Sequence, residues 1–314
     1  MIGYAARRLL AAVPTLLLVA IAVFLLMRLV PGDPAQLMLG DAASLEDVQS
    51  LRLSMGLEAA LPVQFLRWAG AVLVGDFGKS ITNGEAVLPL IVSRFGVTAL
   101  IVLLAVGLAA LLAVPLGMFA AWMQDRPADL AVVGFATLML SIPSFWLGLI
   151  LLLVFGVWLR WLPVVGYVTF SEDPLLAITY IVLPVATLVL VEVGVLTRMA
   201  RASTIDVLNL DYISHARAKG LSEFTVLRRH AFPNAFAPTL TLIGLVLGNL
   251  LGGIAVIETV FTLPGLGRLL VDAIFQRDYP VVQGVMLFVA AIYVGVNLLV
   301  DLAYPLFDPR VTVE

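Results

Sequence analysis

The sequence contains no cysteine and only two histidines among its 314 residues. The absence of cysteine excludes disulfide bonds, a thiol nucleophile and any cysteine-ligated metal site. His215 and His230 stand apart on a polar stretch without a third ligand nearby, so we expect no metal site. A Gly-x-Ser-x-Gly motif and an acidic pair placed for hydrolysis are also missing, which argues against an enzyme.

Charge is scarce as well. Charged residues make up 12% of the chain and hydrophobic residues 62%. Soluble domains contain about 25% charged residues. The formal net charge of −3 gives no indication of nucleic-acid binding. This composition is typical of an integral membrane protein.

Six apolar runs are long enough to cross a bilayer, which takes about 20 mainly apolar residues per helix. Five contain no charged residue, and the remaining one is interrupted only by Glu192. Pro143 leaves open whether the third run is one span or two. Pro233 and Pro238 predict that the fifth span begins a few residues into its run. The runs comprise residues 9–27, 97–123, 131–159, 175–197, 231–257 and 280–300.

The orientation follows from the basic residues near the ends of these runs. Arg7 and Arg8 precede the first run, which is too long for a signal peptide and lacks a small-residue cleavage site, so we expect a retained anchor. The positive-inside rule then places both termini in the cytoplasm. The basic residues on the predicted inner side are Arg7, Arg8, Arg126, Arg198, Arg201, Arg217, Lys219, Arg228, Arg229 and Arg310.

A basic, polar stretch falls in the predicted cytoplasm between two apolar runs. Residues 211–234 read DYISHARAKGLSEFTVLRRHAFPN. Gly220 suits the end of a short helix, because glycine adopts positive φ without a steric penalty. Ser222 suits the N-cap of a second helix, with Thr225 at the capping-box position. Two capped helices favour a docking element over a plain positive-inside loop or a polybasic lipid-binding segment.

This stretch resembles the EAA loop of ABC-importer permeases. The pattern there is Glu-Ala-Ala, three residues, Gly, nine residues and Ile-x-Leu-Pro. Gly220 and Pro233 supply its glycine and proline, whereas Ser214-His215-Ala216 replaces Glu-Ala-Ala. His230 and Phe232 replace the isoleucine and leucine. ARAKGLS, residues 216–222, is similar instead to the version in the dipeptide/oligopeptide/nickel permease family.

The resemblance to that family extends over nearly the whole chain, and its segments occur in the same order. The long loop after the first span resembles the B-type subunit and not its C-type partner. The matching segments are RRLL to FLLMRLVPGDPA (7–35), MGLEAALPVQFLRW (55–68), GDFGKSI (75–81), SIPSFWLGL (141–149), ETVFTLPGLGRLLVDAIFQRDYPVVQG (258–284) and NLLVDLAYPLFDPR (297–310).

The resemblance implies an all-α integral membrane protein of the bacterial cytoplasmic membrane. Its expected fold is that of a type I ABC-importer permease, MetI-like, with six transmembrane helices and both termini inside. The expected parts are a first helix in residues 1–30, an extracytoplasmic segment over 31–95, a permease core of five helices over 96–307 and a cytoplasmic tail over 308–314. The core includes the EAA-type loop 200–236 and an outer segment 261–283.

The resemblance also implies import of di- or oligopeptides by alternating access. Expected partners are a second, homologous permease subunit, two ATPase subunits, a solute-binding protein, the peptide and membrane lipid, without nucleic acid. ATP and Mg would be bound by the ATPases. GDFGKS, residues 75–80, is no Walker A motif, because Leu73 stands where its first glycine is required. We expect no cofactor on this chain and no enzymatic activity of its own.

Coupling to the ATPases is assigned by the resemblance to the cytoplasmic loop. A short helix around residues 212–219 is expected to transmit ATP-driven closure to the fourth and fifth spans. The coupling candidates are Tyr212, His215, Ala216, Arg217, Lys219, Gly220, Leu221 and Ser222.

Polar residues in or beside spans are candidates for the solute pathway, because they are costly in lipid. Glu192 lies in the fourth run beside Gly194, which either admits a neighbouring helix or leaves room for solute. Ser141, Glu258 and Asp301 are further candidates. The alternatives are a polar contact to the partner permease for Glu192 and helix-end or interface carboxylates for Glu258 and Asp301.

The outer segment 261–283 is too polar to span and too apolar for a free loop. Its central residues predict a short amphipathic helix. The resemblance implies that this helix receives the solute-binding protein, and the alternative is a plug over the pore mouth. The docking candidates are Leu269, Leu270, Arg277, Asp278 and Tyr279.

Other functions remain open from the sequence. Nickel chelates and glutathione are alternative solutes within the family. An ion-coupled secondary transporter would carry charged relays and repeat-related broken helices, of which only Glu192 gives a hint. A structural membrane protein would not need the capped cytoplasmic loop.

Overall fold

The computed structural model describes residues 2–29, 34–39, 44–54 and 56–307. These residues form helices and connecting loops, with one isolated bridge between Lys79 and Ala86 and no β-sheet in the ranges described. The chain is all-α, as predicted.

Five described helices are long and apolar enough to cross a membrane by themselves. A bent pair forms a sixth span if its two helices are counted as one: α6 and α7, the latter continued by the π-helix η1, meet at an angle of 98°. The break falls at Pro143, since the residue before a proline avoids the helical region, and Ile142 is extended with ψ 123°. The bounds are α1 Ile2–Leu29, α5 Val87–Trp122, α6 Pro127–Ser141, α7 Ser144–Leu151, η1 Leu152–Trp158, α8 Pro174–Leu208, α11 Phe232–Gly253 and α14 Tyr279–Phe307.

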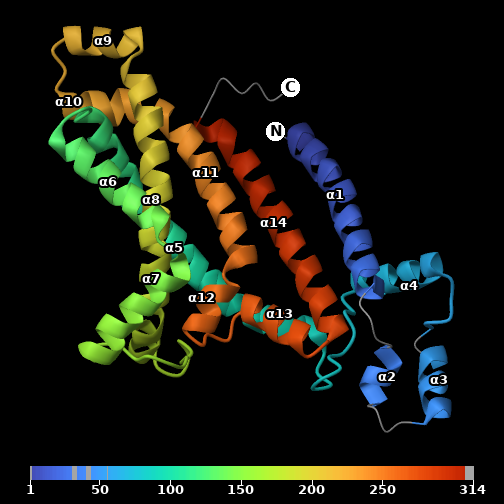
Figure 1. Ribbon diagram of the computed structural model, residues 1–314. Coiled ribbons are helices and arrows are strands. Elements are labelled where there is room, and N and C mark those ends of the chain that lie inside the picture. The colour runs from blue at the N-terminus through green and yellow to red at the C-terminus, as the bar shows by residue number, and fades with distance from the viewer. Residues whose placement is uncertain (1, 30–33, 40–43, 55, 308–314) are drawn as a thin grey trace.

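The shorter helices lie at the two ends of these spans (Figure 1). The end where α1 begins and α14 ends also carries α9 and α10, in agreement with the predicted cytoplasmic side. The opposite, outer end carries α4, α12 and α13. The bounds are α2 Pro34–Leu39, α3 Leu45–Ser54, α4 Leu61–Leu73, α9 Asp211–Ala218, α10 Glu223–Thr225, η2 Val226–Ala231, α12 Ala255–Val260 and α13 Leu266–Phe275.

Several helices are longer than the apolar runs that predicted them. α5 begins at Val87, before the run 97–123, and α8 extends past the run 175–197 to Leu208. The additional turns carry Arg94, Arg198 and Arg201. An apolar run marks the part of a helix that matches the hydrocarbon core, whereas the backbone hydrogen bonds continue beyond it.

The start of the fifth span differs from the prediction. Helix runs without interruption from Glu223 through η2 into α11, so Pro238 lies inside α11 and not at a helix start. Pro233 does occupy the first turn of α11.

Helix α8 is the centre of the packing, and its neighbours approach it at two glycines. A Cβ at Gly117 of α5 would lie 2.6 Å from the Thr197 carbonyl oxygen of α8. A Cβ at Gly194 of α8 would lie 2.8 Å from the Ala136 carbonyl oxygen of α6. Small residues permit such close backbone contacts between membrane helices. Gly194 therefore admits a neighbouring helix, which was one of its two predicted roles.

A buried ion pair also joins α6 to α8. The Arg201 guanidinium donates from Nε to Asp129 Oδ1 and from Nη2 to Asp129 Oδ2, both at 2.6 Å. The Asp129 side chain is buried, and Asp129 also accepts the Asp125 backbone N–H at 3.0 Å. Such a bidentate pair fixes the relative rotation of the two helices as well as their distance.

We predict that Gly117→Ala destabilises the protein, because its methyl group must separate α5 from α8. The free energy of unfolding should fall by about 1–3 kcal/mol, the usual range for overpacking. Gly107→Ala on the same helix is the matched control, since no described atom lies within 4 Å of its Cβ position. Thermal unfolding of both purified variants in detergent checks this. Equal midpoints would show that the α5–α8 contact tolerates a methyl group.

Candidate functional site

Helix α9 stands at the cytoplasmic end of α8 and packs onto the membrane helices through an apolar cluster (Figure 1). Ile213 and Ala216 are buried there against Val226 and Ala231 of η2 and Val207 of α8. Their spacing of three residues puts them on one helical face. The apolar residues in this otherwise polar stretch therefore fix α9 to the ends of α8 and α11.

The two predicted caps are both present. Gly220 follows α9 with φ 78° and donates its N–H to the Arg217 carbonyl at 2.9 Å. Ser222 is the N-cap of α10, where its Oγ accepts the Thr225 N–H at 3.4 Å and lies 2.9 Å from Thr225 Oγ1. The chain therefore turns sharply between α9 and α10 at a position that favours glycine.

An exposed ion pair closes the hairpin between α9 and α10. Arg217 donates from Nε to Glu223 Oε1 at 2.9 Å and from Nη2 to Glu223 Oε2 at 3.2 Å. Of the eight predicted coupling residues, Ala216 is buried inside the cluster and Arg217 faces Glu223. Solvent-exposed residues among the remaining candidates include Tyr212, His215, Lys219, Leu221 and Ser222.

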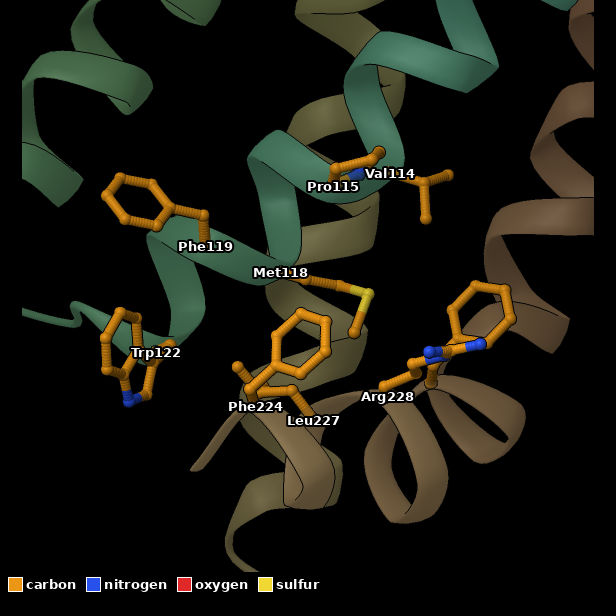
Figure 2. Close-up of a pocket in the computed structure, with 9 residues that line it drawn as sticks. Val114, Pro115, Met118, Phe119, Trp122, Phe224, Leu227 and Arg228 are labelled. Atoms are coloured by element: carbon orange, nitrogen blue, oxygen red, sulfur yellow. The ribbon is translucent and has the colours of Figure 1, made fainter. Parts of the chain in front are cut away.

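An apolar groove of about 460 Å³ separates this hairpin from the cytoplasmic end of α5 (Figure 2). Phe224 of α10 lies on its wall and is 71% exposed. Sequence reasoning missed this groove because its walls come from segments about a hundred residues apart. The full lining is Val114, Pro115, Met118, Phe119, Trp122, Phe224, Leu227, Arg228 and Phe232. The hairpin is therefore anchored through α8 and α11 and is set apart from α5.

Glu192 lies in the middle of α8 and is only 8% exposed. Its Oε2 has no hydrogen-bond partner in the described part of the chain. Leaving a buried carboxylate oxygen unpaired is costly, so a polar partner for this atom would be favourable. A solute or a second permease subunit would provide one, and the pathway role of Glu192 stays a prediction.

The four pathway candidates lie on four different elements. Ser141 ends α6 at the break of the third span, and its Oγ donates to the Thr137 carbonyl at 2.8 Å. Asp301 is half-buried near the cytoplasmic end of α14. Glu258 belongs to α12 at the opposite end of the molecule. Glu258 and Asp301 therefore lie at opposite ends of the molecule, whereas Ser141 and Glu192 are both close in sequence to the contact between α6 and α8 at Gly194.

Glu258 is fully buried and organises the outer segment. Its carboxylate accepts hydrogen bonds from Thr98 Oγ1 at 2.5 Å, from the Arg268 N–H at 2.8 Å and from the Gly267 N–H. Thr98 Oγ1 accepts the Leu266 N–H at 2.8 Å in turn. A carboxylate at the first turn of a helix satisfies its free N–H groups. The geometry favours the alternative of a helix-end carboxylate over a pathway role.

The amphipathic helix predicted in the outer segment is α13. Leu269 and Leu270 pack against a buried cluster of this chain that includes Val87 and Val285. They therefore attach α13 to α5 and α14, and the exposed apolar side chains at its end are Ile274 and Phe275, the latter 84% exposed. The sequence pattern showed an apolar face without showing what it packs against.

The remaining docking candidates occupy the turn between α13 and α14. Arg277 is exposed, whereas Asp278 and Tyr279 are buried. Asp278 accepts hydrogen bonds from the Ser80 hydroxyl and from the backbone N–H groups of Ile81 at 3.1 Å and Thr82 at 3.3 Å. Asp278 thus ties the loop before α5 to the start of α14.

These features define a multi-pass helical membrane protein with a folded hairpin at its cytoplasmic end and a folded outer segment. The chain belongs to the family described as binding-protein-dependent transport system inner membrane component, whose model matches residues 113–313. The model for the N-terminal part of such components matches residues 1–105. The protein is therefore a permease subunit of a binding-protein-dependent importer in the bacterial inner membrane.

Curated relatives align with nearly the full chain. A peptide transport system permease protein of Brucella suis is 44% identical over 305 residues, 97% of each chain. The glutathione transport system permease protein GsiC of Salmonella paratyphi A is 40% identical over 311 residues, 99% of each chain. The oligopeptide transport system permease protein AppB of Bacillus subtilis is 38% identical over 314 residues, also 99% of each.

Among solved structures, the chain is similar to a chain of the MetNI methionine ABC transporter in an inward-facing conformation. The TM-score is 0.56 at 16% identity, over 70% of this chain and 96% of that chain. This likeness shows the predicted MetI-like fold.

We predict that Glu258→Ala disrupts the outer segment, because it leaves the first N–H groups of α13 and the Thr98 hydroxyl without their acceptor. Each buried donor left without its acceptor costs about 1–3 kcal/mol. The matched control is Asp272→Ala, which removes an exposed carboxylate of the same helix, 3.7 Å from Arg268 Nε.

The measurement is the amount of monodisperse purified transporter and its thermal midpoint. Loss of stability in Glu258→Ala with little change in Asp272→Ala supports the structural role. A stable Glu258→Ala transporter with altered uptake would restore Glu258 as a pathway residue.

Proposed function

We propose that this chain is one of two permease subunits of an ATP-driven importer of di- or oligopeptides. The observation that carries the solute class is the similarity, over nearly the whole chain, to permeases of peptide transport systems. The chain by itself provides five spans, or six with the bent pair α6–α7 counted as one, which is about half of the helices expected around a pathway. A second permease of the same fold completes the pathway in this proposal.

Two ATPase subunits bind the cytoplasmic hairpin and hold ATP and Mg in the proposed transporter. Support comes from the shape of the hairpin: a capped helix α9 whose inner face is buried and whose outer face exposes Tyr212, His215 and Lys219. The GDFGKS segment lies in the loop before α5, at the end of the molecule opposite α9. ATP-driven closure pushes α9, and the cluster around Ile213 passes this motion to α8 and α11.

The solute-binding protein docks at the outer end in this proposal. Ile274, Phe275 and Arg277 are the exposed residues of the outer segment that face away from the chain's own cluster. The other docking candidates hold the segment in place from inside the chain: Leu269 and Leu270 pack against its buried cluster, and Asp278 and Tyr279 are buried. The docked protein stabilises the outward-open state and releases its peptide into the pathway.

Glutathione is a second candidate solute. The relative named for glutathione transport is 40% identical and the relative named for oligopeptide transport 38% identical, so similarity does not separate the two. Glutathione is itself a small peptide, so the same type of pathway accommodates both. The choice then depends on the binding protein.

The proposed function is tested with the complete transporter in proteoliposomes that contain ATP. Uptake of labelled di-, tri- and pentapeptides, glutathione and a nickel–histidine chelate is compared in the presence of the binding protein. We expect ATP-dependent accumulation of at least one peptide class. Accumulation of the chelate alone, or of glutathione alone, would replace the peptide assignment.

We predict that Glu192→Gln changes the uptake rate or the range of peptides while the transporter still assembles. The physical reason is an unpaired, buried carboxylate oxygen in a helix that otherwise avoids charge within the membrane. Glu172→Gln, in an exposed outer loop, is the control. If Glu192→Gln transports the same peptides at the wild-type rate, Glu192 is a structural or subunit-interface residue.

A second variant tests the hairpin. Gly220→Val forces a β-branched residue into the left-handed region, at a cost of roughly 1–2 kcal/mol. Its side chain meets no described atom of this chain within 4 Å of Cβ, so its bulk would meet only a docked ATPase. We expect the ATPases to be lost on co-purification and uptake to fall at least tenfold.

Gly220→Asn separates the two causes, because asparagine tolerates positive φ but still adds bulk. Loss of docking in both variants indicates direct contact with the ATPase, and loss in Gly220→Val alone indicates backbone strain. Full ATPase association and uptake in Gly220→Val would contradict the coupling role of the hairpin.

A further inference from the structure

A polar cavity of about 240 Å³ lies at the outer end of the molecule, apart from the apolar groove of the hairpin and from α13. Its walls come from the end of α1, from α4 and its preceding turn, and from the first turn of α14. The polar side chains lining it are Arg28, Gln64, Arg67, Tyr279 and Gln283. No carboxylate is among the described residues that line it. Two guanidinium groups without a lining acid favour an anionic ligand.

Tyr279 gives an independent indication of a ligand. Its side chain is only 8% exposed, and its hydroxyl has no hydrogen-bond partner among the residues that the structure describes. A buried hydroxyl normally finds a partner, because leaving it unpaired is unfavourable. Since Tyr279 lines the cavity, a molecule bound there would supply the missing acceptor or donor.

The arginine of α1 is held in place by neutral groups. Arg28 Nη2 donates to Gln64 Oε1 at 2.7 Å, and its guanidinium carbon lies 4.9 Å from the centre of the Phe24 ring. Gln64 is itself fixed, since its Nε2 donates to the carbonyls of Leu57 and Ala59, each at 2.8 Å. This chain of contacts orients Arg28 at the cavity and connects it to α4.

The position of the cavity identifies the kind of anion. Helix α4 lies across the outer end of α1 (Figure 1), and Leu61, Leu66 and Leu73 on it are exposed. An amphipathic helix at the ends of membrane helices belongs in the bilayer interface, where lipid headgroups lie. Trp68 of the same helix lines the cavity, and tryptophan is enriched at this level of the membrane.

We propose that this cavity binds the headgroup of an anionic phospholipid from the outer leaflet. Arg28 and Arg67 bind the phosphodiester through charge-assisted hydrogen bonds. The Tyr279 hydroxyl and the Gln283 amide bind oxygen atoms of the glycerol backbone or the headgroup. The lipid then joins α1 and α4 to the start of α14 and secures the N-terminal region on the permease core.

The test uses the complete, delipidated transporter in detergent, with dioleoyl phosphatidylglycerol as the probe in native mass spectrometry. In the double variant Arg28→Gln/Arg67→Gln, the dissociation constant for this lipid should rise at least tenfold. In Tyr279→Phe it should rise about threefold or more. Arg160→Gln, an exposed arginine of another outer loop, is the matched control and should bind like the wild type.

Tyr279→Phe also separates a ligand contact from a structural role. Because the hydroxyl is unpaired within the chain, its removal should leave the lipid-free thermal midpoint unchanged or higher, while the rise in midpoint on adding lipid becomes smaller. A lower lipid-free midpoint with normal lipid binding would overturn the proposal.

Two further probes identify the source of the anion. Neutral dioleoylglycerol should bind weakly and equally to all variants, and inorganic phosphate at millimolar concentration should not displace the lipid. Wild-type lipid binding by the double variant, or full stabilisation by inorganic phosphate alone, would contradict a phospholipid site.

Discussion

The packing of the permease depends on the close backbone contacts of α8 with its neighbours. Lipid tails are as apolar as leucine, so burial of apolar side chains does not drive two membrane helices together. At Gly117 and Gly194 the backbones of neighbouring helices come close enough for van der Waals attraction between them, and this attraction holds the helices together instead. The Asp129–Arg201 pair then fixes the rotation of α6 about α8. These contacts also position Glu192 within α8 and the hairpin at the end of α8.

The hairpin is joined to two membrane helices and separated from a third. Ile213 and Ala216 join α9 to α8 and α11 through buried apolar surface, whereas the groove beneath Phe224 separates the hairpin from α5. A force on α9 therefore acts first on the helices that share its cluster. This arrangement agrees with transmission to the fourth and fifth spans, which was expected from the family resemblance before the packing was known.

The features that local sequence determines were predictable, and those that depend on distant pairings were not. The six spans follow from hydropathy, and the caps at Gly220 and Ser222 follow from local turn chemistry. The contacts of Thr98 with Glu258 and of Ser80 with Asp278 join residues 160 and 198 positions apart, so no local pattern indicates them. The apolar face of α13 was recognised, but the pattern could not show that the chain itself covers Leu269 and Leu270.

The two ends of the molecule are stabilised by interactions of different strength. At the outer end, buried Glu258 and Asp278 accept several hydrogen bonds each, and each buried donor left without its acceptor costs about 1–3 kcal/mol. At the cytoplasmic end, the hairpin is closed by the exposed Arg217–Glu223 pair, and exposed pairs contribute about 0–1 kcal/mol. The Arg217–Glu223 pair is therefore weaker than the outer network, and the hairpin is held mainly by its apolar cluster around Ile213. In the transporter proposed above, the ATPases would act on the end held by apolar packing, and the binding protein on the end held by buried hydrogen bonds.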